Sequence, residues 1–310
     1  MTDKQTRRIM VLAAIAVPVF ITAGAALAAE GPDGERSSWR LDPSLTLSGR
    51  VVTAESAARF EDETIDGTAW AVRLAPSLEL ANDDVTLTFR NATTRLEFRD
   101  ADRTDRWQNT ARLSGRFALG DESSVTVFGE RADNMLSAEF SLTDEWEAGG
   151  EFEYAPDKSN RIQLGGSWRE RSYDDGENSS GRGPRVDAEY RYRFGANHYA
   201  YLRGRYDEIS SDNPRREVTR WLASASYQYP LAQDIRVRPE VSYQKLDYRG
   251  RPVAAGGFRS DKVLSPELTI LYSPGPWQVS AEARYIIRSS TDPQFDRSGY
   301  RLALEMSYDF

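Results

Sequence analysis

Cysteine is absent from this chain of 310 residues, and histidine occurs once, as His198. Without cysteine no disulfide or thiol chemistry is available, and a zinc site built from several histidines and cysteines is impossible. A lone histidine also gives little support for hydrolysis, in which the catalytic base is oriented by further residues. We therefore expect no enzymatic activity, no cofactor and no resident metal.

Long apolar runs are missing beyond the N-terminus, and this excludes membrane-spanning helices, which need about 20 apolar residues. The chain also has no excess of basic over acidic residues, and its formal net charge is −8. Nucleic-acid binding rests on basic surface, so we expect no nucleic-acid partner. Lysine is scarce: the chain has four lysines, so 36 of its 40 basic residues are arginines.

The N-terminus has the pattern of a secretory signal. Lys4, Arg7 and Arg8 precede an apolar run from Ile9 to Leu27, and Ala26-Leu27-Ala28 supplies a cleavage site of small residues. We predict a signal peptide at 1–28 and a mature start near Ala29. A single N-terminal anchor helix is the alternative. A short N-terminal segment, 29–43, would come next.

The rest of the chain repeats one unit, a stretch in which apolar and polar residues alternate, ending in a turn or loop. Alternation with a period of two indicates β-strands that have one apolar and one polar face. Most of these stretches are longer than the usual 5–6 residues of a strand and long enough to cross a bilayer at a tilt. About fourteen segments are expected, near 44–53, 68–80, 84–98, 107–119, 123–132, 136–154, 160–172, 184–194, 197–208, 217–229, 234–247, 261–273, 276–288 and 298–310.

The segment 136–154 contains Thr143-Asp144, which has the composition of a hairpin turn and could divide it into two strands. All its apolar residues from Leu136 to Tyr154 have even numbers, and a two-residue turn would reverse that parity. We therefore predict one long strand over 136–154, with a short link at 132–135.

The last strand alternates up to the final residue, an aromatic one. Its apolar positions are Tyr300, Leu302, Leu304, Met306, Tyr308 and Phe310. This resembles the C-terminal strand of Gram-negative outer-membrane β-barrels. The resemblance implies that these six residues form a signal read by the outer-membrane assembly machinery, and that the chain lies among outer-membrane lipid and lipopolysaccharide.

Connections and aromatic residues agree with that resemblance. Short connections alternate with longer polar ones, as periplasmic turns and extracellular loops do in such barrels. Tryptophan and tyrosine concentrate near both ends of the predicted strands, as expected for two membrane interfaces; Trp146, in mid-strand, fits neither group. The fold predicted is all-β: a closed antiparallel transmembrane β-barrel over 44–310, of about fourteen strands, with twelve or sixteen as alternatives.

The alternate face of the strands should line the lumen, and it is rich in charge. Arginine forms fixed pairs with carboxylates, so many of these arginines are expected to pair with neighbouring glutamates and brace the wall. The remainder would set an acidic wall against a basic wall and orient solutes between them. The lumen-lining candidates are Glu139, Glu145, Glu147, Glu151, Glu153, Arg112, Arg116, Arg169, Arg191, Arg193, Arg203, Arg205, Arg220, Arg236 and Arg238.

In architecture the chain resembles the monomeric fourteen-stranded porins, without a shared motif that carries site residues over. The function expected is passive diffusion of small hydrophilic solutes, with sugars and anions among the candidates, across the bacterial outer membrane. Two alternatives stay open: the exit barrel of a polysaccharide or protein export system, and a closed structural or adhesion barrel.

Overall fold

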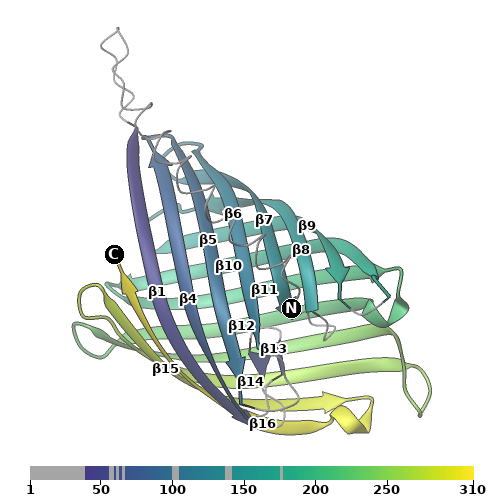
Figure 1. The fold of residues 1–310 in the computed structure, drawn as a ribbon. Helices are drawn as coiled ribbons and strands as arrows, with labels where there is room; N and C mark the ends of the chain where they lie inside the picture. The colour runs from purple at the N-terminus through teal and green to yellow at the C-terminus, as the bar shows by residue number, and fades with distance from the viewer. Residues whose placement is uncertain are drawn as a thin grey trace.

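The computed structural model describes residues 39–55, 59–60, 63–64, 67–99, 105–136, 142–174 and 177–310. Fourteen antiparallel strands form one closed barrel, because the first strand, β1, pairs with the last, β16 (Figure 1). The predicted fold class and strand number are confirmed. The predicted signal peptide, 1–28, lies outside the described residues.

The barrel strands are arranged in chain order around the wall, with only neighbours in sequence paired apart from the closing pair of β1 and β16. They are β1 (Arg40–Glu55), β4 (Gly67–Ala81), β5 (Val85–Phe98), β6 (Arg106–Ala118), β7 (Ser123–Leu136), β8 (Leu142–Tyr154), β9 (Asn160–Tyr173), β10 (Ser180–Gly195), β11 (His198–Ser211), β12 (Val218–Pro230), β13 (Ile235–Pro252), β14 (Phe258–Tyr272), β15 (Trp277–Ser290) and β16 (Arg297–Asp309). The short strands β2 (Arg59–Phe60) and β3 (Glu63–Thr64) pair with each other in the connection after β1. Two single-turn 3₁₀ helices, η1 (Pro214–Arg216) and η2 (Pro293–Phe295), lie in later connections.

The two ends of the barrel differ in their connections. Six turns of two to five residues, such as 196–197 between β10 and β11, lie at the end where β1 begins and β16 finishes; we call this the turn end. The opposite end, the loop end, carries the other connections, including η1 and η2. Several strands run further toward the loop end than expected, since β13 extends to Pro252 and β14 begins at Phe258. At the turn end β1 begins at Arg40, before the predicted barrel start at 44.

The predicted single strand over 136–154 is wrong. β7 ends at Leu136 and β8 begins at Leu142, so the chain turns back between them. The predicted link at 132–135 is instead part of β7, where the register shifts between Ala132 and Met135 and Asn134 has φ 56°. Such a bulge adds one residue and reverses the parity of the residues after it. The expected absence of a turn at Thr143-Asp144 is confirmed, because both residues lie within β8, but the parity of Leu136 does not reveal that it ends the preceding strand.

Aromatic side chains form a belt around each end of the outer face, as predicted. Trp70, Trp107 and Trp168 are exposed near the loop end, and Phe194, Tyr229 and Trp277 near the turn end. Because β8 begins only at Leu142, Trp146 lies close to the loop end and joins the first belt. Among the described residues, no helix is long and apolar enough to cross a membrane.

Candidate functional site

The inner wall of the barrel is identified by the alternation of exposure along each strand. On β8, Trp146, Phe152 and Tyr154 are exposed, whereas Glu145 and Glu147, at the other parity, are buried. The same opposition holds on β9, β10, β11, β12 and β13; on β6, Leu113 and Phe117 are exposed and Arg112, at the other parity, is half-buried. Fourteen of the fifteen predicted lumen residues take the parity opposite to the exposed apolar side chains of their strand; Glu139 lies outside the described residues.

The glutamates of β8 pair with arginines on both sides of that strand. Toward β9, Glu145 pairs with Arg171, and Glu153 lies 2.8 Å from Nη2 of Arg161. Toward β6, Glu151 and Glu153 pair with Arg112 and Arg116, at 3.1 and 3.4 Å. These contacts match the expectation that arginines brace the wall through neighbouring carboxylates. They do not match an acidic β8 wall standing across the lumen from a basic one.

Several ion pairs pass over an intervening strand. Nη1 of Arg185 on β10 lies 2.8 Å from Oε2 of Glu147 on β8, and Arg50 on β1 lies 3.4 Å from Glu282 on β15. Neighbouring strands are roughly 4.8 Å apart, so long side chains on the concave inner face can span two strand spacings. Pairs of this kind bind the wall together beyond the backbone ladder.

A second charged cluster, absent from the sequence-based predictions, surrounds Glu282 on β15. Its carboxylate lies 3.4 Å from Arg50 on β1, 3.6 Å from Arg284 on the same strand and 3.6 Å from Arg301 on β16. In the sequence, Glu282 and Arg284 are only two members of the polar face of an alternating segment. The cluster depends on the junction of β1 with β16, which is set by barrel closure.

Toward the turn end, the inner wall carries arginines that have no carboxylate within ion-pair distance among the described residues. Arg191 and Arg193 lie on β10, and Arg236 and Arg238 lie on β13. The guanidinium of Arg191 lies 5.4 Å from the ring centre of Tyr199 on β11, and Arg236 donates a hydrogen bond to Ser273. This stretch of the wall is positively charged, whereas the charges around β8 are balanced.

Part of the charged wall is in contact with solvent. Arg205 pairs with Asp187 at 2.6 Å, and the two side chains are 38% and 39% exposed although both point inward. They line a cavity of about 490 Å³ together with Arg112, Glu151 and Glu240, which come from strands on either side. Charged side chains at this exposure can be hydrated, so this part of the inner wall is open to solvent.

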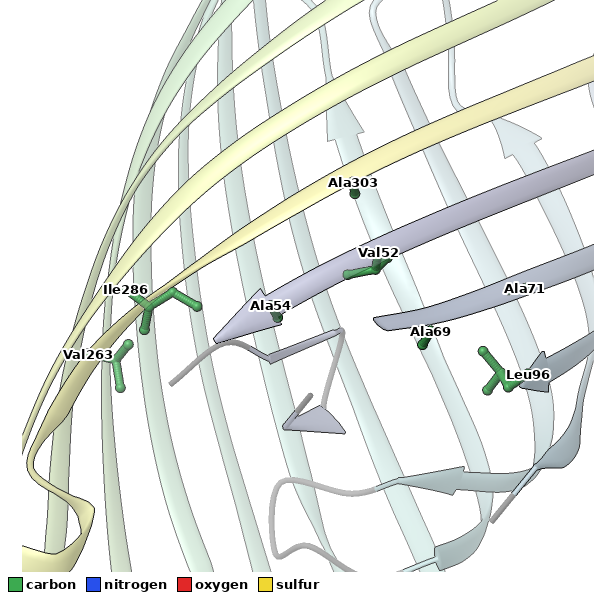
Figure 2. Packing of buried hydrophobic residues seen from close by; sticks show 8 residues of the cluster. All are labelled: Val52, Ala54, Ala69, Ala71, Leu96, Val263, Ile286 and Ala303. Atoms are coloured by element: carbon green, nitrogen blue, oxygen red, sulfur yellow. The ribbon is translucent and has the colours of Figure 1, made fainter. Parts of the chain in front are cut away.

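The loop-end half of the inner wall holds an apolar patch that was not predicted from the sequence. Val52 and Ala54 come after Arg50 on the inward face of β1, and Val263 and Ile286 come from β14 and β15 (Figure 2). The remaining members of the patch are Ala69, Ala71, Leu96 and Ala303. All eight are buried, so the lumen changes from charged to apolar along this side.

Solved structures with the same architecture are outer-membrane proteins. A loop L8 deletion mutant of OmpT, an outer membrane protein of Vibrio cholerae, matches with a TM-score of 0.54 at 9% identity, covering 88% of this chain and 100% of that chain. The outer membrane channel DcaP of Acinetobacter baumannii matches with a TM-score of 0.52 at 12% identity, covering 91% and 100%. The fold is that of the outer-membrane β-barrels. At such identities the likeness concerns the fold alone, and no family model and no curated protein matches the sequence.

In this outer-membrane barrel fold, His198 lies at the turn end, as the first residue of β11. Its ring stacks beside Phe194, with ring centres 4.7 Å apart, and hydrogen-bonds the hydroxyl of Tyr227. The histidine is therefore part of the aromatic belt. In the part of the chain that the structure describes, no group of histidine and acidic residues is arranged to hold a metal.

Proposed function

We propose that this chain is a channel in the bacterial outer membrane through which small hydrophilic solutes diffuse passively. Solutes would be sorted by the width of the lumen and by the glutamates and arginines on its wall. Lipid and lipopolysaccharide would surround the outer face, and the assembly machinery would insert the chain after removal of a signal peptide. A role as a channel is favoured over an enzyme because the single histidine belongs to the aromatic belt.

The observation that carries the proposal is the exposure of inward-facing charges. Arg205 and Asp187 point into the barrel, yet each keeps more than a third of its side chain in contact with solvent. A lumen closed by side chains would bury such a pair. Fourteen strands also make a wider barrel than the eight-stranded kind that side chains can fill.

A closed structural or adhesion barrel is the second candidate, and the loop-end half of the wall favours it. There the apolar patch around Val52 and Ile286 is buried, and Arg169 and Asp207 are buried on the other side. A narrowing at this level would sort solutes if it stayed open and would block them if it closed. The export-barrel alternative has no contact in the described residues that favours it.

Liposome swelling tests the proposal with solutes of graded size. Vesicles that contain the purified full-length mature protein should swell in isotonic arabinose, glucose and sucrose at rates that fall with sugar size. Protein-free vesicles give the background, and a heat-denatured sample controls for leakage. Swelling no faster than background with every sugar would support the closed barrel instead.

A further inference from the structure

A second cavity, of about 520 Å³, lies at the loop end, away from the charged lumen around β8. Its walls come from the β11–β12 connection with η1, the tip of the β13–β14 hairpin and the β15–β16 connection with η2. A volume of this size is in the range of small-ligand pockets, about 300–1,000 Å³. The proposed diffusion of solutes through the lumen gives this cavity no role.

The two connections that carry η1 and η2 are built alike. Residues 210–217 read Ser-Ser-Asp-Asn-Pro-Arg-Arg-Glu, and residues 289–296 read Ser-Ser-Thr-Asp-Pro-Gln-Phe-Asp. In the first, the side chain of Asn213 accepts a hydrogen bond from the backbone N–H of Arg215 at 3.1 Å; in the second, Asp292 accepts one from Gln294 at 3.3 Å. Both turns begin with proline at the first helical position, which limits their backbone freedom. The cavity therefore has two preformed edges.

A glycine sets the distance between η1 and β13. A Cβ atom added to Gly250 would lie 1.9 Å from the carbonyl oxygen of Pro214, so only glycine lets the two segments meet. At this contact Nε of Arg251 donates a hydrogen bond to the carbonyl oxygen of Arg215, at 3.1 Å. Arg215 and Arg251 are thereby held next to each other at one wall of the cavity.

Aromatic rings orient the arginines of the cavity. The guanidinium of Arg251 lies 4.4 Å from the ring centre of Tyr248, and that of Arg259 lies 3.4 Å from the ring centre of Phe295. Arg259 is also held by Asp261, with Nε 2.9 Å from Oδ1. Stacking fixes the plane of a guanidinium, whose edge carries its N–H donors. The side chain of Arg215 is exposed and makes no ion pair within the described part of the chain.

The other side chains of the cavity suit hydroxyl groups. Glu177 accepts a hydrogen bond from the side-chain amide of Asn213 at 2.9 Å, and Asp292 accepts one from that of Gln294 at 2.8 Å. Carboxylate and amide pairs of this kind accept from and donate to the vicinal hydroxyls of a sugar. The described lining of the cavity thus holds four arginines, Arg215, Arg216, Arg251 and Arg259, and two acids.

We propose that this cavity binds an acidic oligosaccharide at the loop-end mouth of the barrel. Arg215 and Arg251 would hold a carboxylate or sulfate group of the sugar through charge-assisted hydrogen bonds. Asn213, Glu177 and Gln294 would bind hydroxyls of the same sugar. A simple inorganic anion would use the arginines alone, whereas a sugar would also contact the amide and carboxylate groups beside η1 and η2.

Calorimetry on the full-length mature protein in detergent micelles tests this. The probes are trigalacturonate, which is carboxylated, a heparin-derived disaccharide, which is sulfated, and maltotriose, which is neutral. At least one acidic probe should bind, more weakly as salt rises, and maltotriose should not. The double variant Arg215→Gln/Arg251→Gln should bind about tenfold more weakly or worse. Arg182→Gln, which changes an exposed arginine at the same end, should bind as the wild type does.

The single variant Arg215→Gln is the control for misfolding of the double variant, because the side chain of Arg215 is exposed and its replacement should leave the fold intact. This variant should also bind the acidic probe more weakly than the wild type. Equal binding of maltotriose and the acidic probes would overturn the proposal, because charge would then play no part. An equal loss in Arg182→Gln would overturn it as well, because the effect would be one of overall charge. Absence of binding by both acidic probes would mean that there is no such site. These outcomes are separate from conduction, since liposome swelling with neutral sugars does not require the cavity to bind.

Discussion

Arg169 on β9 reaches over β10 to Asp207 on β11, where Nη2 lies 3.1 Å from Oδ1 and the two side chains are 0% and 4% exposed. Asp207 also pairs with Arg220 on β12, at 2.7 Å. Gly183 on β10 stands opposite Arg169 and has no side chain to block the way. A Cβ atom there would lie 2.0 Å from the carbonyl oxygen of Glu208, so β10 and β11 approach closely at this point.

Removing Asp207 should destabilise the barrel strongly. In Asp207→Ala two buried arginines lose their shared carboxylate, and breaking a buried ion pair from one side costs about 3–5 kcal/mol. Asp187→Ala is the matched control, because its pair with Arg205 is solvent-exposed and such pairs contribute about 0–1 kcal/mol. Urea unfolding monitored by tryptophan fluorescence compares the two. Equal losses of stability would contradict the distinction between buried and hydrated parts of the wall.

Neutralising the β8 glutamates should shift ion selectivity toward anions. The triple variant Glu147→Gln/Glu151→Gln/Glu153→Gln leaves Arg185, Arg112 and Arg116 without these carboxylate partners, so the wall gains net positive charge. We expect a several-fold rise in the chloride-to-potassium permeability ratio, measured as a reversal potential across a salt gradient. Glu170→Gln, at an exposed position of the outward parity on β9, is the control and should change nothing. Unchanged selectivity in the triple variant would remove these residues from the conducting path.

Asp212 makes the loop end sensitive to acid. Its carboxylate accepts hydrogen bonds from the backbone N–H and hydroxyl of Ser180, at 2.8 and 3.1 Å, and the backbone bond is the main reason that its pKa lies below the usual 3.8. Because the folded pKa is lowered, the stabilisation is complete above the usual value and is lost as the pH falls through the lower, folded value. The amide shift of Ser180 should therefore titrate below pH 3.8. In Asp212→Asn that titration should vanish, and a midpoint at or above the usual value in the wild type would contradict the assignment.

The C-terminal residue should matter for assembly. The backbone N–H of Phe310 donates to the carbonyl oxygen of Leu45 at 2.9 Å, and its ring packs on Tyr308, with ring centres 4.5 Å apart. Deletion of Phe310 should lower the fraction of chains that reach the folded, heat-modifiable form in cells. Leu231→Ala, which changes an exposed residue of a turn at the same end, should have no effect. Equal yields of folded barrel for both variants would argue against a C-terminal assembly signal.

Which face of a strand a residue occupies could be predicted from the sequence. Side chains alternate along a strand, so the inward positions of Glu147, Arg169 and Arg203 can be assigned once the strands are located. The number of strands was obtained in the same way, from the count of alternating segments. The β7 bulge at Asn134 is where this reasoning failed, because the extra residue reverses the parity of β7 and gives Leu136, at the end of β7, the same parity as the apolar residues of β8.

Which inward charges meet could not be predicted, because that depends on the register between strands. Arg185 finds Glu147 two strands away, and Arg50 finds Glu282 only because the barrel closes between β1 and β16. The apolar patch was missed for a related reason. Val51 and Val52 are both apolar, so alternation alone does not reveal that Val52 joins Ile286 from the other side of the closure.

Single-channel recording of the purified mature protein in a planar bilayer tests whether the barrel has a water-filled, charged lumen. We expect steady open currents in potassium chloride, with a reversal potential that shifts toward that of chloride in the triple glutamine variant of β8. Suppose that the wild-type protein inserts into the bilayer and is shown to be folded by its heat-modifiable mobility. If it then passes no current, the lumen is closed and the proposed channel is wrong.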